Sequence, residues 1–101
     1  AALDAASGTG AVVLVDCLTL WVSNLLLADA DIEQATAGLR AAIARFDGRL
    51  ILVANETGLG IVPDNALARR FRDAAGRVNQ AVAAVAEEVT FIVAGLPMRV
   101  K

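Results

Sequence analysis

The chain has 101 residues, 57% of them hydrophobic, and its nine basic and eleven acidic residues leave a net charge of −2. This balance argues against a general binder of nucleic acids or membrane surfaces, and no apolar run approaches the ~20 residues that a membrane helix needs. There is no histidine, the commonest general base, and Cys17 is the single cysteine, which excludes an internal disulfide. We therefore expect one cytoplasmic domain, or part of one.

Three short apolar runs are rich in β-branched residues and end in a polar residue or a glycine. They are 11-AVVLVD-16, 50-LILVAN-55 and 89-VTFIVAG-95. Because each run is continuously apolar rather than alternating, it is typical of a parallel strand buried on both faces. A turn at Gly95 and Pro97 would lead to a last short strand over residues 98–101.

Helical patterns occupy the segments between these runs. An apolar helix is expected over residues 18–28, and a second helix over 32–46, where Asp31 starts a capping-box arrangement. A third helix is expected over 65–88, with Pro63 at its beginning. This order predicts right-handed crossovers and a parallel sheet that helices cover on both faces. Since three strands make a small sheet and the chain does not begin with Met, further strands are expected on the N-terminal side.

The first predicted strand ends in Asp16, at the edge of a parallel sheet where ligands bind. An apolar strand ending in Asp is the Walker-B pattern, in which the carboxylate holds Mg²⁺ beside nucleotide phosphates, directly or through water. The alternative is that Asp16 caps the helix over 18–28, with help from Thr19. The pattern alone favours neither interpretation.

The second predicted strand is followed by Glu56, which gives a second carboxylate at the same edge, next to Asn55. Neighbouring carboxylates suit metal binding or general-base chemistry. Gly58 and Gly60 then allow a ligand to approach the backbone closely, or they simply form a turn.

Arginines are concentrated in the first half of the third predicted helix, at Arg69, Arg70, Arg72 and Arg77. Guanidinium groups pair bidentately with phosphates, which makes these side chains candidate phosphate ligands. The alternative, favoured for each arginine by itself, is a solvated face with pairs such as Arg69–Asp73. The sequence has no GxxxxGK[ST] motif, and 7-SGTG-10 does not replace it, because it lacks Lys and precedes a strand.

Three segments combine these features: 14-LVDCLTLWVSNLL-26, 53-VANETGLGIVPDNALARRFRDAAGRVNQAVAAVAEEV-89 and 93-VAGLPMRVK-101. Together they strongly resemble the bifunctional adenosylcobinamide kinase/adenosylcobinamide-phosphate guanylyltransferase family of cobalamin biosynthesis. The resemblance covers the chain from about Ala11 onward, and the long run NExGxGIVPxNxxARxFRDxxGRxNQ makes it specific.

The resemblance implies a RecA-like P-loop NTPase fold of three layers, with a mostly parallel sheet, and a homotrimer. It implies two reactions that use GTP or ATP together with Mg²⁺. In the first, a nucleoside triphosphate phosphorylates the aminopropanol hydroxyl of adenosylcobinamide. In the second, GTP donates GMP to that phosphate through a guanylylated histidine, which gives adenosylcobinamide-GDP and pyrophosphate.

By position, Asp16 matches the acidic residue at the family's Walker-B-like strand end, and would act in catalysis and bind nucleotide and Mg²⁺. Glu56, a second catalytic candidate, and Asn55 match the family's NE pair. Arg69 and Arg72 match its ARxFRD segment. The resemblance implies that Asn55, Glu56, Arg69 and Arg72 contact substrate, nucleotide or metal.

The sequence departs from the family because it contains neither the P-loop nor the guanylylated histidine of the family's N-terminal half. Residues 1–101 are therefore expected to be the C-terminal portion of a single P-loop domain, inactive alone, with an exposed sheet edge where the P-loop strand belongs. One alternative is a non-catalytic module that completes a separate P-loop chain. Another, a fragment of a generic P-loop ATPase, is disfavoured by the ARRFRD…GRVNQ helix.

Overall fold

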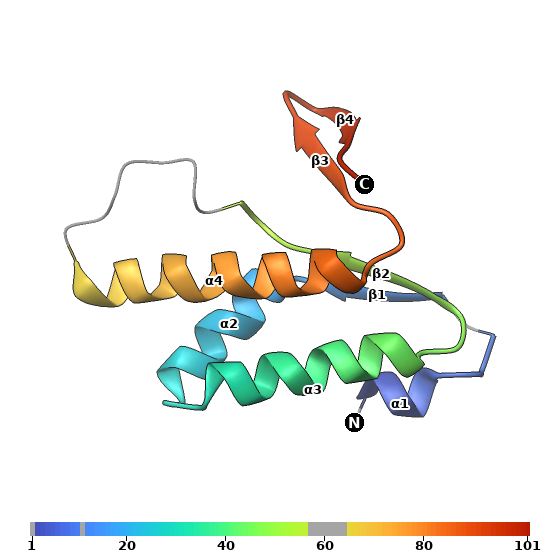
Figure 1. The fold of residues 1–101 in the computed structure, drawn as a ribbon, viewed down its shortest axis with the longest axis horizontal. Coiled ribbons are helices and arrows are strands. Elements are labelled where there is room, and N and C mark those ends of the chain that lie inside the picture. Colours follow the sequence, from blue (N-terminus) through green and yellow to red (C-terminus); the bar gives the residue numbers. More distant parts are fainter. Residues whose placement is uncertain (1, 11, 57–64) are drawn as a thin grey trace.

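The computed structural model describes residues 2–10, 12–56 and 65–101 (Figure 1). Its elements follow the order α1 (Ala2–Ala6), β1 (Val12–Asp16), α2 (Leu18–Leu27), α3 (Ile32–Arg45), β2 (Arg49–Val53), α4 (Ala66–Val85), β3 (Thr90–Val93) and β4 (Leu96–Arg99). The result is a mixed α/β structure with a small parallel sheet. Within the described ranges, none of the helices combines the length and the apolar character that crossing a membrane requires.

The first two predicted strands pair in parallel, as expected. The register runs from Val12 opposite Arg49 to Asp16 opposite Val53, so the carboxyl ends of β1 and β2 lie at the same edge. The helices α2 and α3 lie between the two strands in the chain and supply the long crossover that a parallel pair needs.

Only one face of this sheet is covered within the described residues, so the expectation of helices on both faces is wrong here. Side chains alternate between the faces of a strand. On the inner face, Val15 and Leu52 pack against the core. On the outer face, Val12 is 62% exposed and Leu14 is 61% exposed, because no described helix lies over them.

The core joins α2 to α4. It consists of Leu18, Val22, Leu26, Ala74, Ala75, Val78 and Val82. Adjacent alanines at 74 and 75 have little side-chain volume, so the apolar side chains of α2 approach the α4 backbone closely. Val22 and Val78 are the largest side chains that are completely buried.

The third predicted strand does not join the parallel sheet, which corrects the prediction for residues 89–95. Instead β3 pairs antiparallel with β4, with Val93 opposite Leu96. Ala94 and Gly95 both have positive φ, 52° and 77°, as a tight two-residue hairpin turn requires. This turn brings the chain straight back along β3, so that β4 pairs with one edge of β3, and the other edge pairs with no described strand.

The hairpin also changes two smaller expectations. The turn lies at Ala94 and Gly95, and Pro97 lies inside β4, opposite Ile92. The last strand is therefore Leu96–Arg99 rather than residues 98–101. Figure 1 shows the hairpin standing away from the helices, and Ile92 is 61% exposed.

The helices largely follow the predictions. Asp31 is the N-cap of α3, and its Oδ1 accepts a hydrogen bond from the Gln34 backbone N at 3.1 Å. The N-cap of α4 is Asn65, whose Oδ1 accepts hydrogen bonds from the next helical N–H groups at 2.8 and 3.2 Å. The expected helix start at Pro63 lies outside the described residues.

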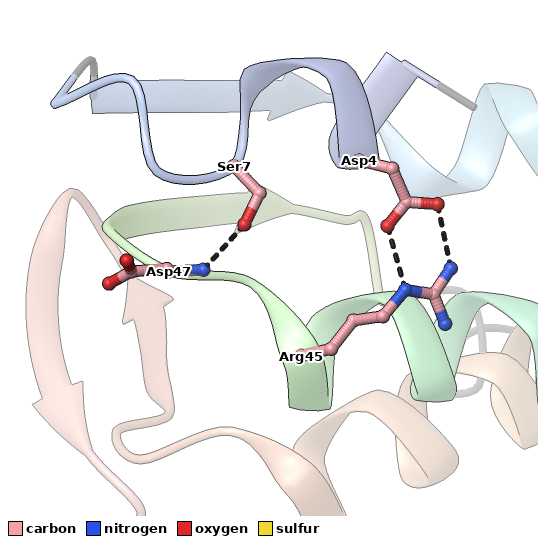
Figure 2. A network of polar contacts seen from close by, with 4 residues as sticks. All are labelled: Asp4, Ser7, Arg45 and Asp47. Atoms are coloured by element: carbon pink, nitrogen blue, oxygen red, sulfur yellow. Dashed lines mark hydrogen bonds and ion pairs between the residues drawn. The ribbon is translucent and has the colours of Figure 1, made fainter.

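The sequence patterns do not predict α1, which is too short to show a periodicity. Its position is set by contacts with the end of α3 and the turn after it (Figure 2). Arg45 donates two hydrogen bonds to Asp4, and the Ser7 Oγ accepts one from the Asp47 backbone N at 2.8 Å. The Gly8 N–H also donates to the Asp47 carbonyl at 2.7 Å.

Candidate functional site

Asp16 is the last residue of β1, and its side chain is exposed at the carboxyl edge of the sheet. Within the described residues, the Asp16 carboxylate makes no hydrogen bond or ion pair. The alternative role as a helix cap is wrong: Cys17 is the N-cap of α2, and its Sγ accepts from the Leu20 backbone N at 3.4 Å. The carboxylate is therefore left available for a ligand.

Thr19 does not help to cap α2 either. Its Oγ1 accepts a hydrogen bond at 2.8 Å from the backbone N of Asn55, just beyond β2. This contact links the start of α2, three residues after Asp16, to the end of the neighbouring strand. The register of the strands and this link together place Asn55 at the edge where Asp16 lies, and Glu56 follows Asn55 directly in the chain.

Asn55 is also held from the other side. Asn79 of α4 donates through Nδ2 to the Asn55 carbonyl at 3.2 Å. Both backbone polar groups of Asn55 thus have side-chain partners, one from α2 and one from α4. In this structure Asn55 contributes its backbone to the site as an anchor, while its side chain is exposed.

The structure separates the two predicted arginines. Arg69 lines an open hollow of about 740 Å³ between α3 and α4, whereas Arg72 does not. Arg72 lies two helical turns before Asn79, on the same face of α4, which is the side toward the end of β2. Arg72 is therefore the better placed of the two to serve a ligand at the edge with Asp16 and Glu56.

The hollow beside Arg69 carries charges of both signs. Its charged lining residues are Asp31, Glu33, Arg40, Arg69, Arg70, Asp73 and Arg77. The Asp31 carboxylate caps α3. Arg70 forms an ion pair with Asp29 at 3.9 Å, and both side chains are largely exposed, so the pair adds little to stability. The near balance of charge suits a solvated groove better than a phosphate site.

The residue types at the strand ends fit Mg²⁺. This ion takes oxygen ligands and is usually held by one or two carboxylates, together with water and substrate phosphates. Among the residues that the structure describes, no three acidic, cysteine or histidine side chains are grouped closely enough to hold a metal by themselves. A single exposed carboxylate at Asp16 agrees with a metal that phosphate and water share.

Sequence reasoning missed Asn79 and misassigned Thr19. Asn79 stands in the GRVNQ part of the motif, inside a helix with an apolar stripe, where asparagine is disfavoured unless its side chain has a specific partner. An asparagine inside this helix was therefore the sequence signal that could have identified Asn79 as a residue with a specific partner. Gly58 and Gly60 lie outside the described residues.

The chain matches, over residues 1–100, the family described as cobinamide kinase / cobinamide phosphate guanyltransferase, CobU. It is 48% identical over 103 residues to the bifunctional adenosylcobalamin biosynthesis protein CobP of Pseudomonas aeruginosa, a match that covers 100% of this chain and 60% of the relative. The CobU proteins of Salmonella typhimurium and Escherichia coli are 41% and 45% identical to it, over 88% and 89% of this chain and 58% of each relative. The chain thus spans less than two thirds of the length of these relatives. Because the family match takes in nearly every residue, the chain belongs to the cobinamide kinase / cobinamide phosphate guanyltransferase family.

Proposed function

We propose that this chain is part of a bifunctional enzyme of cobalamin biosynthesis. The enzyme phosphorylates adenosylcobinamide with ATP or GTP, and then transfers GMP from GTP to the product, giving adenosylcobinamide-GDP and pyrophosphate. The observation that carries the proposal is the family match over residues 1–100, in which Asp16 stands at the carboxyl end of a parallel strand. The names of the relatives support the pathway.

The fold proposal is a three-layer, RecA-like P-loop domain. The outer face of β1 and β2 supports it, because Val12, Leu14, Ile51 and Val53 are large apolar side chains that lie exposed there. Parallel sheets are almost always covered on both faces. A further layer of the complete protein, including the P-loop strand, would bury these side chains and occupy an open edge of the sheet.

Within this site the residues have separate roles. Asp16 would hold Mg²⁺, which neutralises charge on the nucleotide phosphates when it is bound. Glu56 would either bind that ion through water or accept the proton of the attacking hydroxyl. Arg72 would contact phosphate, and Arg69 would act further from the reacting groups.

The sequence contains no P-loop lysine motif and no histidine to guanylylate. We therefore propose that these 101 residues catalyse neither reaction alone and that the intact enzyme is a homotrimer. A second candidate function is a non-catalytic subunit that completes a separate P-loop chain. The exposed apolar face of β1 and β2 also suits that role.

Calorimetric titration of GTP with Mg²⁺ tests the proposal, on this chain and on the complete gene product that contains it. We expect binding by the complete product and none by the 101 residues. Tight binding by the 101 residues would contradict the proposed division of the site. If the complete product also fails to bind, but binds once a separately encoded P-loop chain is added, the second candidate is correct.

A further inference from the structure

Two helices hold one residue at the carboxyl end of β2. The Thr19 Oγ1 of α2 accepts from the Asn55 N–H at 2.8 Å, and the Asn79 Nδ2 of α4 donates to the Asn55 carbonyl at 3.2 Å. These contacts join positions 36 and 24 residues apart in the chain. They are therefore tertiary contacts, and neither of them caps a helix.

The two hydrogen bonds take over from the backbone hydrogen bonds between β1 and β2, which end at Val53. β2 ends at Val53, so the backbone groups of Asn55 have no partner strand. Backbone N–H and C=O groups require partners, and here two side chains supply them. Since both polar groups of Asn55 are held, the direction in which the chain leaves the strand is fixed, one residue before Glu56.

Thr19 and Asn79 form a clamp on the backbone of Asn55, and both belong to firmly packed helices. Thr19 lies beside Leu18, which is 3% exposed, and Asn79 follows Val78, which is completely buried. The packing of α2 against α4 therefore sets the distance between the two partners of Asn55. Asp16 lies just before α2, so the two hydrogen bonds hold the backbone that leads into Glu56 in place relative to Asp16.

We propose that Thr19 and Asn79 are positioning residues for the Glu56 carboxylate. They hold the backbone of Asn55 so that Glu56 faces the ligand site beside Asp16, and they act on the reaction only through Glu56. This inference rests on the proposed function of the same site. A merely structural role would affect folding and leave the chemistry of Glu56 unchanged.

The experiment is a set of double-mutant cycles in the complete gene product. Thr19→Val and Asn79→Ala each remove one hydrogen bond, and Thr19→Ser retains the acceptor. Gln80→Ala is the matched control, because Gln80 is an exposed neighbour on the same helix. Each change is made in the wild type and in Glu56→Gln, and kcat and KM for GTP are measured for both reactions.

We expect Thr19→Val and Asn79→Ala to lower kcat by on the order of tenfold in the wild type, because small displacements of a reacting group are costly. In the Glu56→Gln background the same changes should cost less than about twofold, since residues that act through one group are not additive. Thr19→Ser and Gln80→Ala should retain kcat. Equal losses in both backgrounds, or no loss in the wild type, would overturn the positioning role.

Amide hydrogen exchange in the same variants provides a readout that does not depend on activity. We expect faster exchange at Asn55 and Glu56 in Thr19→Val and Asn79→Ala, with the core amides of α4 unchanged; unchanged exchange at Asn55 and Glu56 would overturn the proposal. If the wild type is inactive, or Glu56→Gln has full activity, the proposed function of Glu56 is wrong. If Glu56→Gln lowers kcat as expected, but the losses from Thr19→Val and Asn79→Ala are the same in both backgrounds, only the positioning role is wrong and the proposed function stands.

Discussion

Asp4 of α1 and Arg45 of α3 are joined by two parallel hydrogen bonds, from Nε to Oδ1 and from Nη2 to Oδ2, both 2.7 Å long (Figure 2). A bidentate pair of this kind fixes the relative orientation of its two partners. A helix as short as Ala2–Ala6 is not stable in isolation. The pair and the Ser7–Asp47 contact therefore account for the place of α1 against α3.

The same pair predicts a pH dependence. The hydrogen bond from Arg45 is the largest cause that lowers the pKa of Asp4 to about 2, and the N-terminal amino group and the charge of Arg45 lower it further. Because the pKa is lower in the folded state, the pair contributes stability above the ordinary Asp pKa of about 3.9, and this contribution is lost as the pH falls to about 2. NMR titration of the Asp4 carboxyl should give the lowered value.

Arg45→Ala should return the pKa of Asp4 toward its ordinary value. Arg40→Ala, on the same helix, is the control and should leave it low. Both side chains of the pair are about half exposed, so the change in global stability at neutral pH should be small. A pKa of Asp4 that stays near 2 in Arg45→Ala would show that another group causes the shift.

Asp16→Asn tests the proposed metal role. In the complete gene product we expect at least a roughly 10–100-fold loss of Mg²⁺-dependent turnover, the loss that is usual when even an indirect partner of a bound metal is altered. Because Asp16 is exposed, its replacement should change stability by less than about 0.5 kcal/mol. Turnover at several Mg²⁺ concentrations gives the loss, and Asp29→Asn, a surface change at a remote turn, is the control. Unchanged turnover in Asp16→Asn would remove Asp16 from the site.

The core between α2 and α4 predicts a contrast between two positions on one helix. Val22 is 1% exposed, and Leu20 is 59% exposed. Val22→Ala should lower the free energy of unfolding by about 2 kcal/mol, through lost burial and the cavity left behind. Leu20→Ala should change it by less than about 0.5 kcal/mol. Urea unfolding of the complete gene product measures both, and equal losses would mean that Leu20 is buried in the complete protein.

The parallel pair and the three long helices could be predicted because their signals are local. Strand continuity, helical periodicity and the Asp31 cap are properties of single segments. The direction of β3 could not be predicted, because residues 89–95 are as continuously apolar as the other runs. The turn at Ala94 and Gly95 decides the pairing, and alanine at positive φ is not an expected turn residue.

In the candidate site, too, the features that depend on one segment could be predicted, and those that depend on several elements could not. Asp16 was predicted because the end of an apolar strand can be read from the sequence. The N-cap of α2 could not be predicted, because Asp16 and Cys17 are adjacent and a sequence pattern does not locate the start of a helix to a single residue. The clamp on Asn55 joins three separate elements, so no local pattern reveals it. Arg69 and Arg72 are only three positions apart and neighbours on the surface of α4, so the sequence could not tell that Arg69 lines the hollow beside α3 and Arg72 does not.

Two glycines allow the same substitution to be tested with opposite expected signs. Gly38 lies inside α3, and a Cβ added there would meet no atom within 4 Å. Gly38→Ala should therefore raise the free energy of unfolding by about 0.5–1 kcal/mol, because alanine loses less conformational entropy in a helix. Gly95 also has open space around it, but its φ of 77° disfavours any L side chain.

Gly95→Ala should consequently destabilise the β3–β4 hairpin by about 1–2 kcal/mol. The measurement is urea unfolding for both variants, together with amide exchange at Val93 and Leu96, which pair across the turn. Since the hairpin stands away from the helical core, the loss should appear as faster exchange in β3 and β4, with α4 unchanged. If Gly95→Ala proves neutral by both measurements, the turn does not require positive φ, and the reason given for antiparallel pairing of β3 would be wrong.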